Sequence, residues 1–273
     1  MTINVLISTI DQGIEKIKDV LLPFRPDVKY IISHQFRHEK FLSIPLELIR
    51  DDVQISQIPG QGLTRSRNNA IKLATGEICV IADDDVKYTN EYFDTIIDTY
   101  KHNSIDVACF KICKVVGADD YKFYPPKACQ IKSIHQHSAS SIEITFNLRA
   151  ITENNVFFDE RFGLGSWLNG GGEILFINDA IAAGLNVWYF PEYIVKHPHE
   201  CTITKFGKYH KRKIRVTGAM DMRLHGTIAF LKTLPRTIKL FPDLIKNRKN
   251  PITYLYQTFE GNIYILKNKN RNK

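Results

Sequence analysis

A short apolar segment followed by three consecutive carboxylates constrains the fold of this chain more than any other feature. Residues 78–82, Ile-Cys-Val-Ile-Ala, have the continuous apolar character of a strand buried on both faces. Asp83, Asp84 and Asp85 follow directly. Ligands of open α/β sheets bind outside the carboxyl ends of the strands, and a divalent cation relieves repulsion between adjacent carboxylates. The pattern therefore predicts a metal-dependent site, with an acidic turn capping the next helix as the alternative.

The segment before this strand predicts a loop, a helix and a turn. Gly60 and Gly62 favour the loop, apolar residues at helical spacing follow, and we expect Gly76 to end the helix as its C′ glycine. Arg65 and Arg67 lie at the helix start, where their guanidinium groups could pair with phosphates. A solvated basic helix start is the alternative interpretation.

A strand, a helix and a second strand within the first 33 residues indicate a parallel sheet. The further strands and helices follow the same alternation of apolar runs and helical spacing. We expect strands over residues 3–8, 28–33, 53–58, 106–114, 142–148, 187–190 and 193–195, with Pro191 ending the strand at 187–190, and helices over residues 13–22, 92–101 and 173–183. The predicted class is α/β, a mostly parallel sheet flanked by helices, with a basic helical appendage at the C-terminus.

That appendage, residues 204–273, mixes lysine and arginine with apolar side chains. The spacing predicts two or three amphipathic helices, whose basic and apolar faces would suit a membrane surface. An ordinary packing element with a solvated basic face explains the pattern equally well. Residues 267–273 form a basic tail that we expect to fray.

Composition limits the class of protein. The 273 residues are 44% hydrophobic and 24% charged, which suits one large globular domain with an appendage and excludes a disordered chain. The five cysteines include no C-x-x-C pair, so we expect reduced thiols in a cytoplasmic protein. The sequence contains no run of 18 apolar residues, so no transmembrane helix is predicted. The net charge of +8 is not accompanied by a known nucleic-acid-binding motif, so we expect no nucleic acid partner.

Four segments together resemble one known family. Residues 62–68, Gly-Leu-Thr-Arg-Ser-Arg-Asn, are similar to its G-x-x-x-A-R-N segment, and residues 76–85 to its G-x-x-x-x-x-x-D-x-D segment. Residues 158–163, Phe-Asp-Glu-Arg-Phe-Gly, resemble its F-D-E-x-F stretch, and Gly171-Gly172-Glu173 before a helix resembles its E-D motif. The chain thus resembles the inverting glycosyltransferases of family 2, which have the GT-A fold, over about residues 3–200. The resemblance implies a catalytic domain at 1–203, with a nucleotide-binding half at about 1–115 and an acceptor half at about 116–203.

The resemblance also implies a nucleotide-sugar donor whose diphosphate is bridged by Mn²⁺ or Mg²⁺. Asp85 is expected to bind the metal directly, Asp83 to bind the ribose or a metal-bound water, and His197 to be a further ligand. His199, two residues on, is the alternative histidine. The alternative to metal binding is that both histidines simply lie on the surface at the end of a strand.

Donor binding is predicted for Thr9, Ser33, Gln35, Arg67, Asp83 and Asp84. The chain departs from the family pattern after its first and second strands, so the nucleobase is not predicted. Glu173 is the expected general base for the acceptor hydroxyl, with a first-turn glutamate favoured by the helix dipole as the alternative. Trp167, Gly171 and Gly172 are the expected acceptor-binding residues, although packing also explains a loop tryptophan.

The predicted function is metal-dependent, inverting transfer of a sugar to a glycan or lipid-linked saccharide in surface polysaccharide assembly. The basic appendage would allow peripheral contact with the inner face of the plasma membrane. A metal-dependent nucleotidyltransferase and a non-enzymatic protein that binds membranes or nucleic acid are the alternatives. A zinc hydrolase built on His135-x-His137 and His197-x-His199 lacks the H-E-x-x-H motif and cysteine pairs that would support it.

Overall fold

The computed structural model of this chain describes residues 1–116, 119–198 and 207–269. The chain divides into two compact units. The sheet unit comprises Met1–Phe158 and Glu173–Glu200, and the helical unit comprises Asp159–Gly172 and Cys201–Lys273.

The predicted division of the chain differs from these units at one segment. Asp159–Gly172, which the prediction assigned to the catalytic domain, groups with the C-terminal helices. The predicted boundary between residues 203 and 204 lies outside the described residues.

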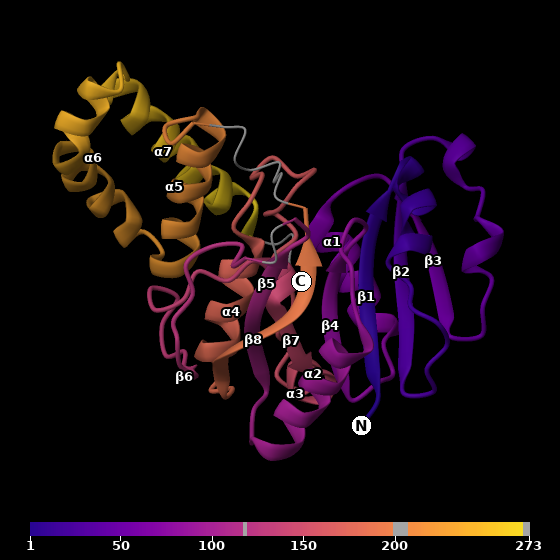
Figure 1. Ribbon diagram of the computed structural model, residues 1–273. Helices are drawn as coiled ribbons and strands as arrows, with labels where there is room; N and C mark the ends of the chain where they lie inside the picture. The colour runs from indigo at the N-terminus through magenta and orange to yellow at the C-terminus, as the bar shows by residue number, and fades with distance from the viewer. Residues whose placement is uncertain (117–118, 199–206, 270–273) are drawn as a thin grey trace. The chain divides into compact units, whose positions relative to one another are not determined.

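An eight-stranded sheet forms the first unit, in the order β3-β2-β1-β4-β7-β5-β8-β6 (Figure 1). Its strands are β1 (Ile3–Ile10), β2 (Val28–Phe36), β3 (Val53–Pro59), β4 (Ile78–Asp83), β5 (Val107–Lys114), β6 (Cys129–Gln130), β7 (Ile144–Asn147) and β8 (Val187–His197). The first four strands in this order are parallel, as are β5 and β8, whereas β7 and β6 pair antiparallel with their neighbours. The predicted fold class, a mostly parallel sheet flanked by helices, is confirmed.

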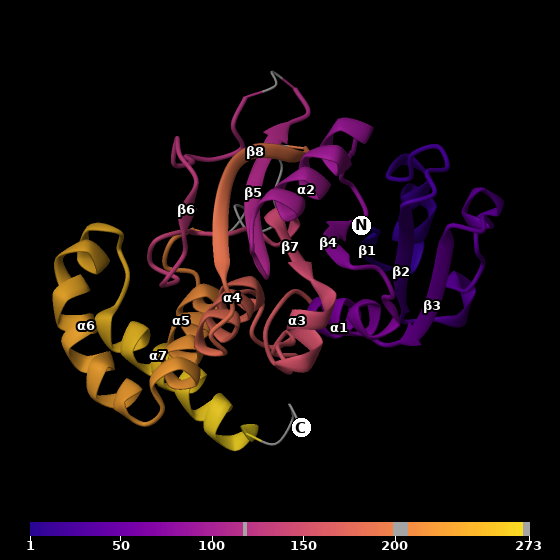
Figure 2. The same cartoon turned by 90° about the horizontal axis from the view of Figure 1, so that it is seen from below.

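Helices cover both faces of the sheet (Figure 2). One face carries the 3₁₀ helix η1 (Asp11–Asp19) and α2 (Asn90–His102), and the other carries α1 (Leu63–Leu73), α3 (Leu148–Glu153) and α4 (Gly172–Ala182). Successive side chains of a strand point to opposite faces of the sheet, so each strand contributes to both cores. In β1, Val5 and Ile7 pack with η1 and α2, while Leu6 packs with α1 and α4. Burial on both faces explains the continuous apolar runs of the central strands.

The structural roles predicted for Pro191 and Gly76 were wrong. Pro191 does not end a strand: β8 continues from Val187 to His197, and its pairing with β5 shifts register around the proline, which tolerates the missing N–H. Gly76 is not the C′ glycine of α1, because α1 ends at Leu73 and Gly76 has no positive φ. Its small size is needed instead because an added Cβ would lie 3.0 Å from the Asn4 side chain.

Two element predictions also needed correction. The helix expected at 13–22 is the 3₁₀ helix η1, which ends at Asp19. The strand expected at 142–148 is shortened to Ile144–Asn147, because the 3₁₀ turn Ser141–Glu143 precedes it. That turn is fixed by reciprocal hydrogen bonds between Ser140 and Glu143, a capping box.

Three helices dominate the second unit: α5 (Lys211–His225), α6 (Ile228–Lys246) and α7 (Pro251–Lys267) (Figure 1). The backbones of α5 and α7 approach closely at two glycines. A Cβ on Gly218 would lie 2.1 Å from the Thr258 carbonyl oxygen, and one on Gly261 would lie 2.1 Å from the Arg215 carbonyl oxygen. Among the described residues, no helix is long and apolar enough to cross a membrane.

Candidate active site

The carboxyl ends of three neighbouring parallel strands define the site. Ser8 of β1 stands in register with Ser33 of β2 on one side and with Asp83 of β4 on the other. Thr9 and His34 form the next pair along β1 and β2, followed by Ile10 and Gln35. The predicted donor residues of these strands therefore lie along one edge of the sheet, where open α/β sheets bind their ligands.

The three carboxylates at the end of β4 have three different partners. Asp83 pairs with Arg67 of α1, Asp84 with Thr9 of β1, and Asp85 with His197 at the end of β8. The side chain of Asp85 is 44% exposed and that of Asp83 is 32% exposed, so these two have the freest access to a ligand. Elements far apart in the sequence thus divide one acidic run into three distinct groups.

Asp85 and His197 face each other, with Oδ1 and Nε2 separated by 3.3 Å. The other ring nitrogen, Nδ1, lies 2.6 Å from the Pro198 carbonyl oxygen, which can only accept a hydrogen bond. Nδ1 therefore carries a proton, and a neutral ring presents its Nε2 lone pair to the Asp85 carboxylate. Only a cation between the two atoms, a proton or a metal ion, makes this contact favourable.

The ionisation of this pair reflects the same contact. The hydrogen bond from His197, opposed by burial, lowers the pKa of Asp85. Burial by itself would lower the pKa of His197, but the hydrogen bond and the charge of Asp85 outweigh it and raise that pKa. Without a metal ion, the two groups thus stabilise each other as an ion pair.

Asp84 is turned toward β1 and η1. Its Oδ2 accepts a hydrogen bond of 2.5 Å from the Thr9 hydroxyl. A Cβ on Gly13 of η1 would lie 2.3 Å from both of these oxygens, so the carboxylate occupies space that only a glycine leaves open. Burial and the neighbouring Asp85 and Asp83 raise the pKa of Asp84. Asp84 therefore joins β4 to β1, packs against Gly13 of η1, and is less open to a metal than Asp85.

Arg67 neutralises Asp83. Its Nη2 donates to Asp83 Oδ1 at 2.9 Å and to the Ser141 hydroxyl at 2.8 Å. The guanidinium is 2% exposed and lies 5.5 Å from the centre of the Phe158 ring. Arg67 thus lies at the site with one of its nitrogens bound to a carboxylate, and its role in donor binding stays a prediction.

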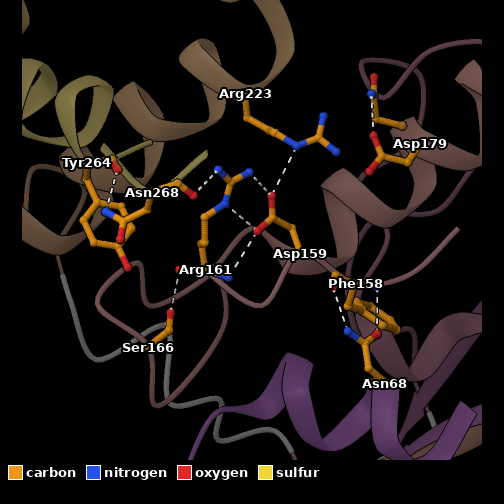
Figure 3. Close-up of polar contacts among 10 residues, drawn as sticks. Asn68, Phe158, Asp159, Arg161, Ser166, Asp179, Arg223, Tyr264 and Asn268 are labelled. Carbon is orange, nitrogen blue, oxygen red and sulfur yellow. Dashed lines mark hydrogen bonds and ion pairs between the residues drawn. The ribbon is translucent and has the colours of Figure 1, made fainter. Parts of the chain in front are cut away.

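The neighbouring Asn68 holds the segment that leads out of the sheet unit. Its side-chain amide donates to the Phe158 carbonyl and accepts from the Phe158 N–H, both at 2.9 Å (Figure 3). Two successive residues of α1 therefore have different contacts: Arg67 binds Asp83, and Asn68 binds the backbone of Phe158, where the chain leaves the sheet unit.

Orphaned polar atoms mark the same strand ends. In the part of the chain that the structure describes, Ser8 Oγ, Gln35 Nε2 and Arg67 Nε are buried without a hydrogen-bond partner. Buried polar groups are nearly always paired, so three orphans at one edge are consistent with a polar ligand there. Ser33 differs, because its hydroxyl is fully buried and accepts a hydrogen bond from Asn69 of α1.

Sequence reasoning missed a polar cluster where β1 and β2 end. Asp11, at φ 50°, accepts hydrogen bonds from the Arg37 backbone N–H at 2.9 Å and from Arg37 Nε at 2.6 Å. The Asp11 carbonyl oxygen lies 2.9 Å from His34 Nε2, and His34 Nδ1 lies 3.2 Å from Gln57 Nε2. An aspartate directly after a buried strand was the available signal, but its partner Arg37 could be found only from the strand pairing.

Glu173 belongs to the sheet unit and lies in the first turn of α4. Gly170 and Gly171 precede it with φ values of 150° and 84°, which side-chain-bearing residues rarely adopt. An added Cβ on Gly171 would also lie 2.9 Å from the sulfur of Met220 of α5, so packing accounts for this glycine. Gly172 is the buried first residue of α4. The roles of Glu173 and of both glycines remain predictions.

Trp167 packs within the helical unit. Its ring stacks on Tyr264 of α7 with 4.5 Å between ring centres, and the guanidinium of Arg215 lies 5.1 Å from the Trp167 ring centre. The side chain is still 43% exposed. Packing thus explains the position of this residue, and its predicted contact with an acceptor sugar remains untested.

An ionic network fixes the loop before Trp167. Asp159 is 2% exposed and accepts hydrogen bonds from Arg161 Nε and Nη2 and from Arg223 Nε of α5 (Figure 3). Arg161 Nη1 also donates to the Asn268 carbonyl at 3.1 Å. The Phe-Asp-Glu-Arg-Phe motif therefore anchors this loop to two helices of its unit.

A complete metal site is not built by side chains alone. Among the described residues, no three His, Cys, Asp or Glu side chains are grouped closely enough to hold an ion. Asp85 and His197 offer two donor atoms, and Mg²⁺ sites commonly combine one or two protein ligands with substrate phosphates. His199, the alternative ligand, lies outside the described residues.

Comparisons with known proteins identify the family. The profile described as glycosyl transferase family 2 matches residues 10–161, more than half of the chain. No curated protein matches. The structure of S. aureus TarS is similar with a TM-score of 0.57 at 16% sequence identity, over 84% of this chain and 42% of that chain. This chain thus spans less than half of that TarS chain.

Shorter TarS structures are similar as well. TarS 1–349 gives a TM-score of 0.56 at 14% identity, over 84% of this chain and 68% of that chain. Its complex with UDP-GlcNAc gives 0.55 at 14% identity, over 84% and 70%. At such low identity the likeness establishes the fold alone, and the family match adds the class. This chain belongs to glycosyl transferase family 2, and it has the GT-A fold.

Proposed function

We propose that this glycosyltransferase moves a sugar from a nucleotide-sugar donor to a glycan or lipid-linked saccharide, with a divalent metal ion and with inversion at the anomeric carbon. The observation that carries the proposal is the Asp85–His197 pair at the carboxyl edge of the sheet, 3.3 Å apart with the Nε2 lone pair facing a carboxylate. This edge also holds the orphaned polar atoms that a ligand would satisfy. Surface polysaccharide assembly is the role that we propose for the product.

Asp85 and His197 are the residues that would hold Mn²⁺ or Mg²⁺. The donor set fits, because a carboxylate oxygen and an imidazole nitrogen both accept such ions and the diphosphate would complete the coordination. When bound, the ion would neutralise the charge that develops on the departing nucleoside diphosphate. Asp83, already paired with Arg67, would orient the ribose or a metal-bound water.

The nucleoside would lie along the ends of β1 and β2. Gln35 Nε2 and Ser8 Oγ are buried and unpartnered there, and Thr9 fixes the neighbouring Asp84. S. aureus TarS has been crystallised with UDP and with UDP-GlcNAc, so uridine nucleotides are the first donors to test. Glu173 is the proposed general base, and Trp167 with Gly171 and Gly172 are the proposed acceptor contacts.

Ligand-induced stabilisation tests the donor and the metal together. The melting temperature would be measured with UDP, GDP, CDP and their nucleotide sugars, each with and without Mn²⁺. A nucleotide at 100 times its Kd should stabilise the fold by about 2.7 kcal/mol. We expect a shift that requires Mn²⁺ and disappears in Asp85→Ala and in His197→Ala.

Asp98→Ala is the matched control, because Asp98 is an exposed aspartate of α2. It should keep the full shift. A shift for one nucleotide that is equal with and without Mn²⁺ would overturn the metal assignment and leave the donor. No shift with any nucleotide would overturn the donor proposal itself.

A turnover assay tests the general base. Glu173→Gln should bind the nucleotide sugar as wild type does but lose 10²-fold or more in transfer rate, about what general base catalysis contributes. Full activity in this variant would assign the base elsewhere. The configuration of the product, read by NMR of the anomeric proton, would test inversion directly.

A further inference from the structure

The outer face of α6 is apolar, which is the reverse of what a helix on a protein surface normally presents. Six large side chains on α6 are each more than half exposed: Ile228, Leu231, Leu234, Ile238, Phe241 and Ile245. The buried positions of the same helix are instead small or polar at Ala229, Thr233 and Thr237, with one leucine, Leu244. Packing within the bundle therefore does not account for these six side chains.

The six side chains form one continuous stripe along the helix. At 3.6 residues per turn, their spacing of three and four residues places them within an arc of roughly 140°. Ile252 and Tyr256 of α7 add two further exposed side chains, 76% and 64% exposed, on a neighbouring helix of the same unit (Figures 1 and 2). An apolar stripe of this length requires an occupant.

Cations border the stripe. Lys232, Lys239 and Lys246 recur every seven residues, so they line one edge of it, and all three are exposed. Arg248 and Lys249 follow in the exposed turn before α7. The single acid among residues 228–250, Asp243, already pairs with Lys208 and Tyr209. One edge of the stripe is therefore positive along its length.

We propose that α6 lies in the plane of an anionic phospholipid bilayer, with its apolar stripe among the acyl chains and its lysines at the headgroup phosphates. Helices with an apolar face and a lysine-rich border bind membranes in this way. A second copy of the chain is a poorer occupant, because a symmetric interface would present the same lysines twice without carboxylates to meet them. An interfacial helix needs only one apolar face, whereas no described helix is long and apolar enough to span a bilayer.

Vesicle co-sedimentation of the full chain tests the proposal without nucleotide or acceptor, so its outcome is independent of the proposed transfer reaction. We expect binding to vesicles of phosphatidylglycerol and phosphatidylcholine, and much weaker binding to phosphatidylcholine alone. Lys232→Gln/Lys239→Gln/Lys246→Gln should weaken binding about 100-fold, since each cation near an anionic surface contributes about a fivefold change. Leu231→Ser/Ile238→Ser/Ile245→Ser should weaken it by at least as much, since each buried methylene contributes about fourfold.

Leu46→Ser/Ile49→Ser is the matched control, because these side chains of the sheet unit are 81% and 70% exposed but have no lysine border like that of α6. This variant should bind like wild type, and all variants should keep the wild-type circular dichroism. Equal binding of wild type and the serine variant would overturn the proposal. The absence of vesicle binding would also overturn the proposal. If the protein without lipid then forms a dimer that the serine variant abolishes, a second copy covers the stripe.

Discussion

Replacing Asn68 by alanine should destabilise the sheet unit strongly, because its side chain holds the buried backbone of Phe158. The substitution removes two hydrogen bonds of 2.9 Å, one donated to the Phe158 carbonyl and one accepted from the Phe158 N–H. Phe158 is 2% exposed, so water cannot replace either bond. Each buried backbone group left unpaired costs about 1–3 kcal/mol, so we expect a loss of about 4 kcal/mol in the free energy of unfolding.

Urea unfolding, monitored by tryptophan fluorescence, measures the free energy of unfolding of the sheet unit. The chain has two tryptophans, Trp167 in the helical unit and Trp188 in the sheet unit, so Trp167→Phe leaves a single reporter of the sheet. Asn69→Ala is the adjacent control. Its amide donates to the side-chain hydroxyls of Ser33 and Ser56, both at 3.1 Å, and not to a backbone group among the described residues. We therefore expect a loss of about 1 kcal/mol. Equal losses for the two alanine variants would refute the reasoning.

Three further predictions follow from the site and the motif loop. Gly13→Ala should lower the free energy of unfolding by about 1–3 kcal/mol, because its Cβ would displace the Asp84 carboxylate; urea unfolding measures it. His197→Gln should lower the melting temperature of the metal-free protein most between pH 3.8 and 6.5. The ion pair is fully present there; it is lost as the pH falls through the lowered pKa of Asp85 or rises through the raised pKa of the histidine. Asp159→Asn should cost the helical unit about 3–5 kcal/mol in urea, because the buried Arg161 loses its carboxylate partner.

Each of these has its own control. Gly207→Ala adds a Cβ with no atom within 4 Å and should leave stability unchanged, so an equal loss at both glycines would disprove the steric argument. A pH-independent effect of His197→Gln would mean that the ring acts through packing alone. Asp159→Asn should spare the unfolding of the sheet unit read by Trp188, and a parallel loss there would contradict a role confined to the helical unit.

The sheet and the position of its carboxylates were predictable from local patterns. Continuous apolar runs marked the central strands, and a strand, a helix and a strand in the first 33 residues required parallel pairing. Parallel pairing alone places the residues after β1, β2 and β4 at one edge. The candidate site could therefore be located before any contact was known.

The partners of the site residues were not predictable, because they depend on register and packing between distant segments. Arg67 was expected to pair with phosphates, but its partners Asp83 and Ser141 could be found only from the structure. Pro191 appeared to end a strand, and only the shifted pairing of β8 with β5 accommodates it. The periodicity of α6 indicated an amphipathic helix but could not reveal that its apolar side faces outward.

Three adjacent carboxylates would repel one another if they shared one environment. Three distant elements prevent this: Arg67 cancels the charge of Asp83, Thr9 and burial remove Asp84 from the edge, and Asp85 is left beside His197. The most exposed carboxylate of the run is thus the one that faces a histidine, a side chain that also binds metal ions. A nucleoside diphosphate brings negative charge of its own, so a site with one exposed carboxylate can hold it with a divalent cation, whereas three exposed carboxylates would repel it. The pairing of the other two aspartates is therefore as important for the proposed donor binding as the metal ligands themselves.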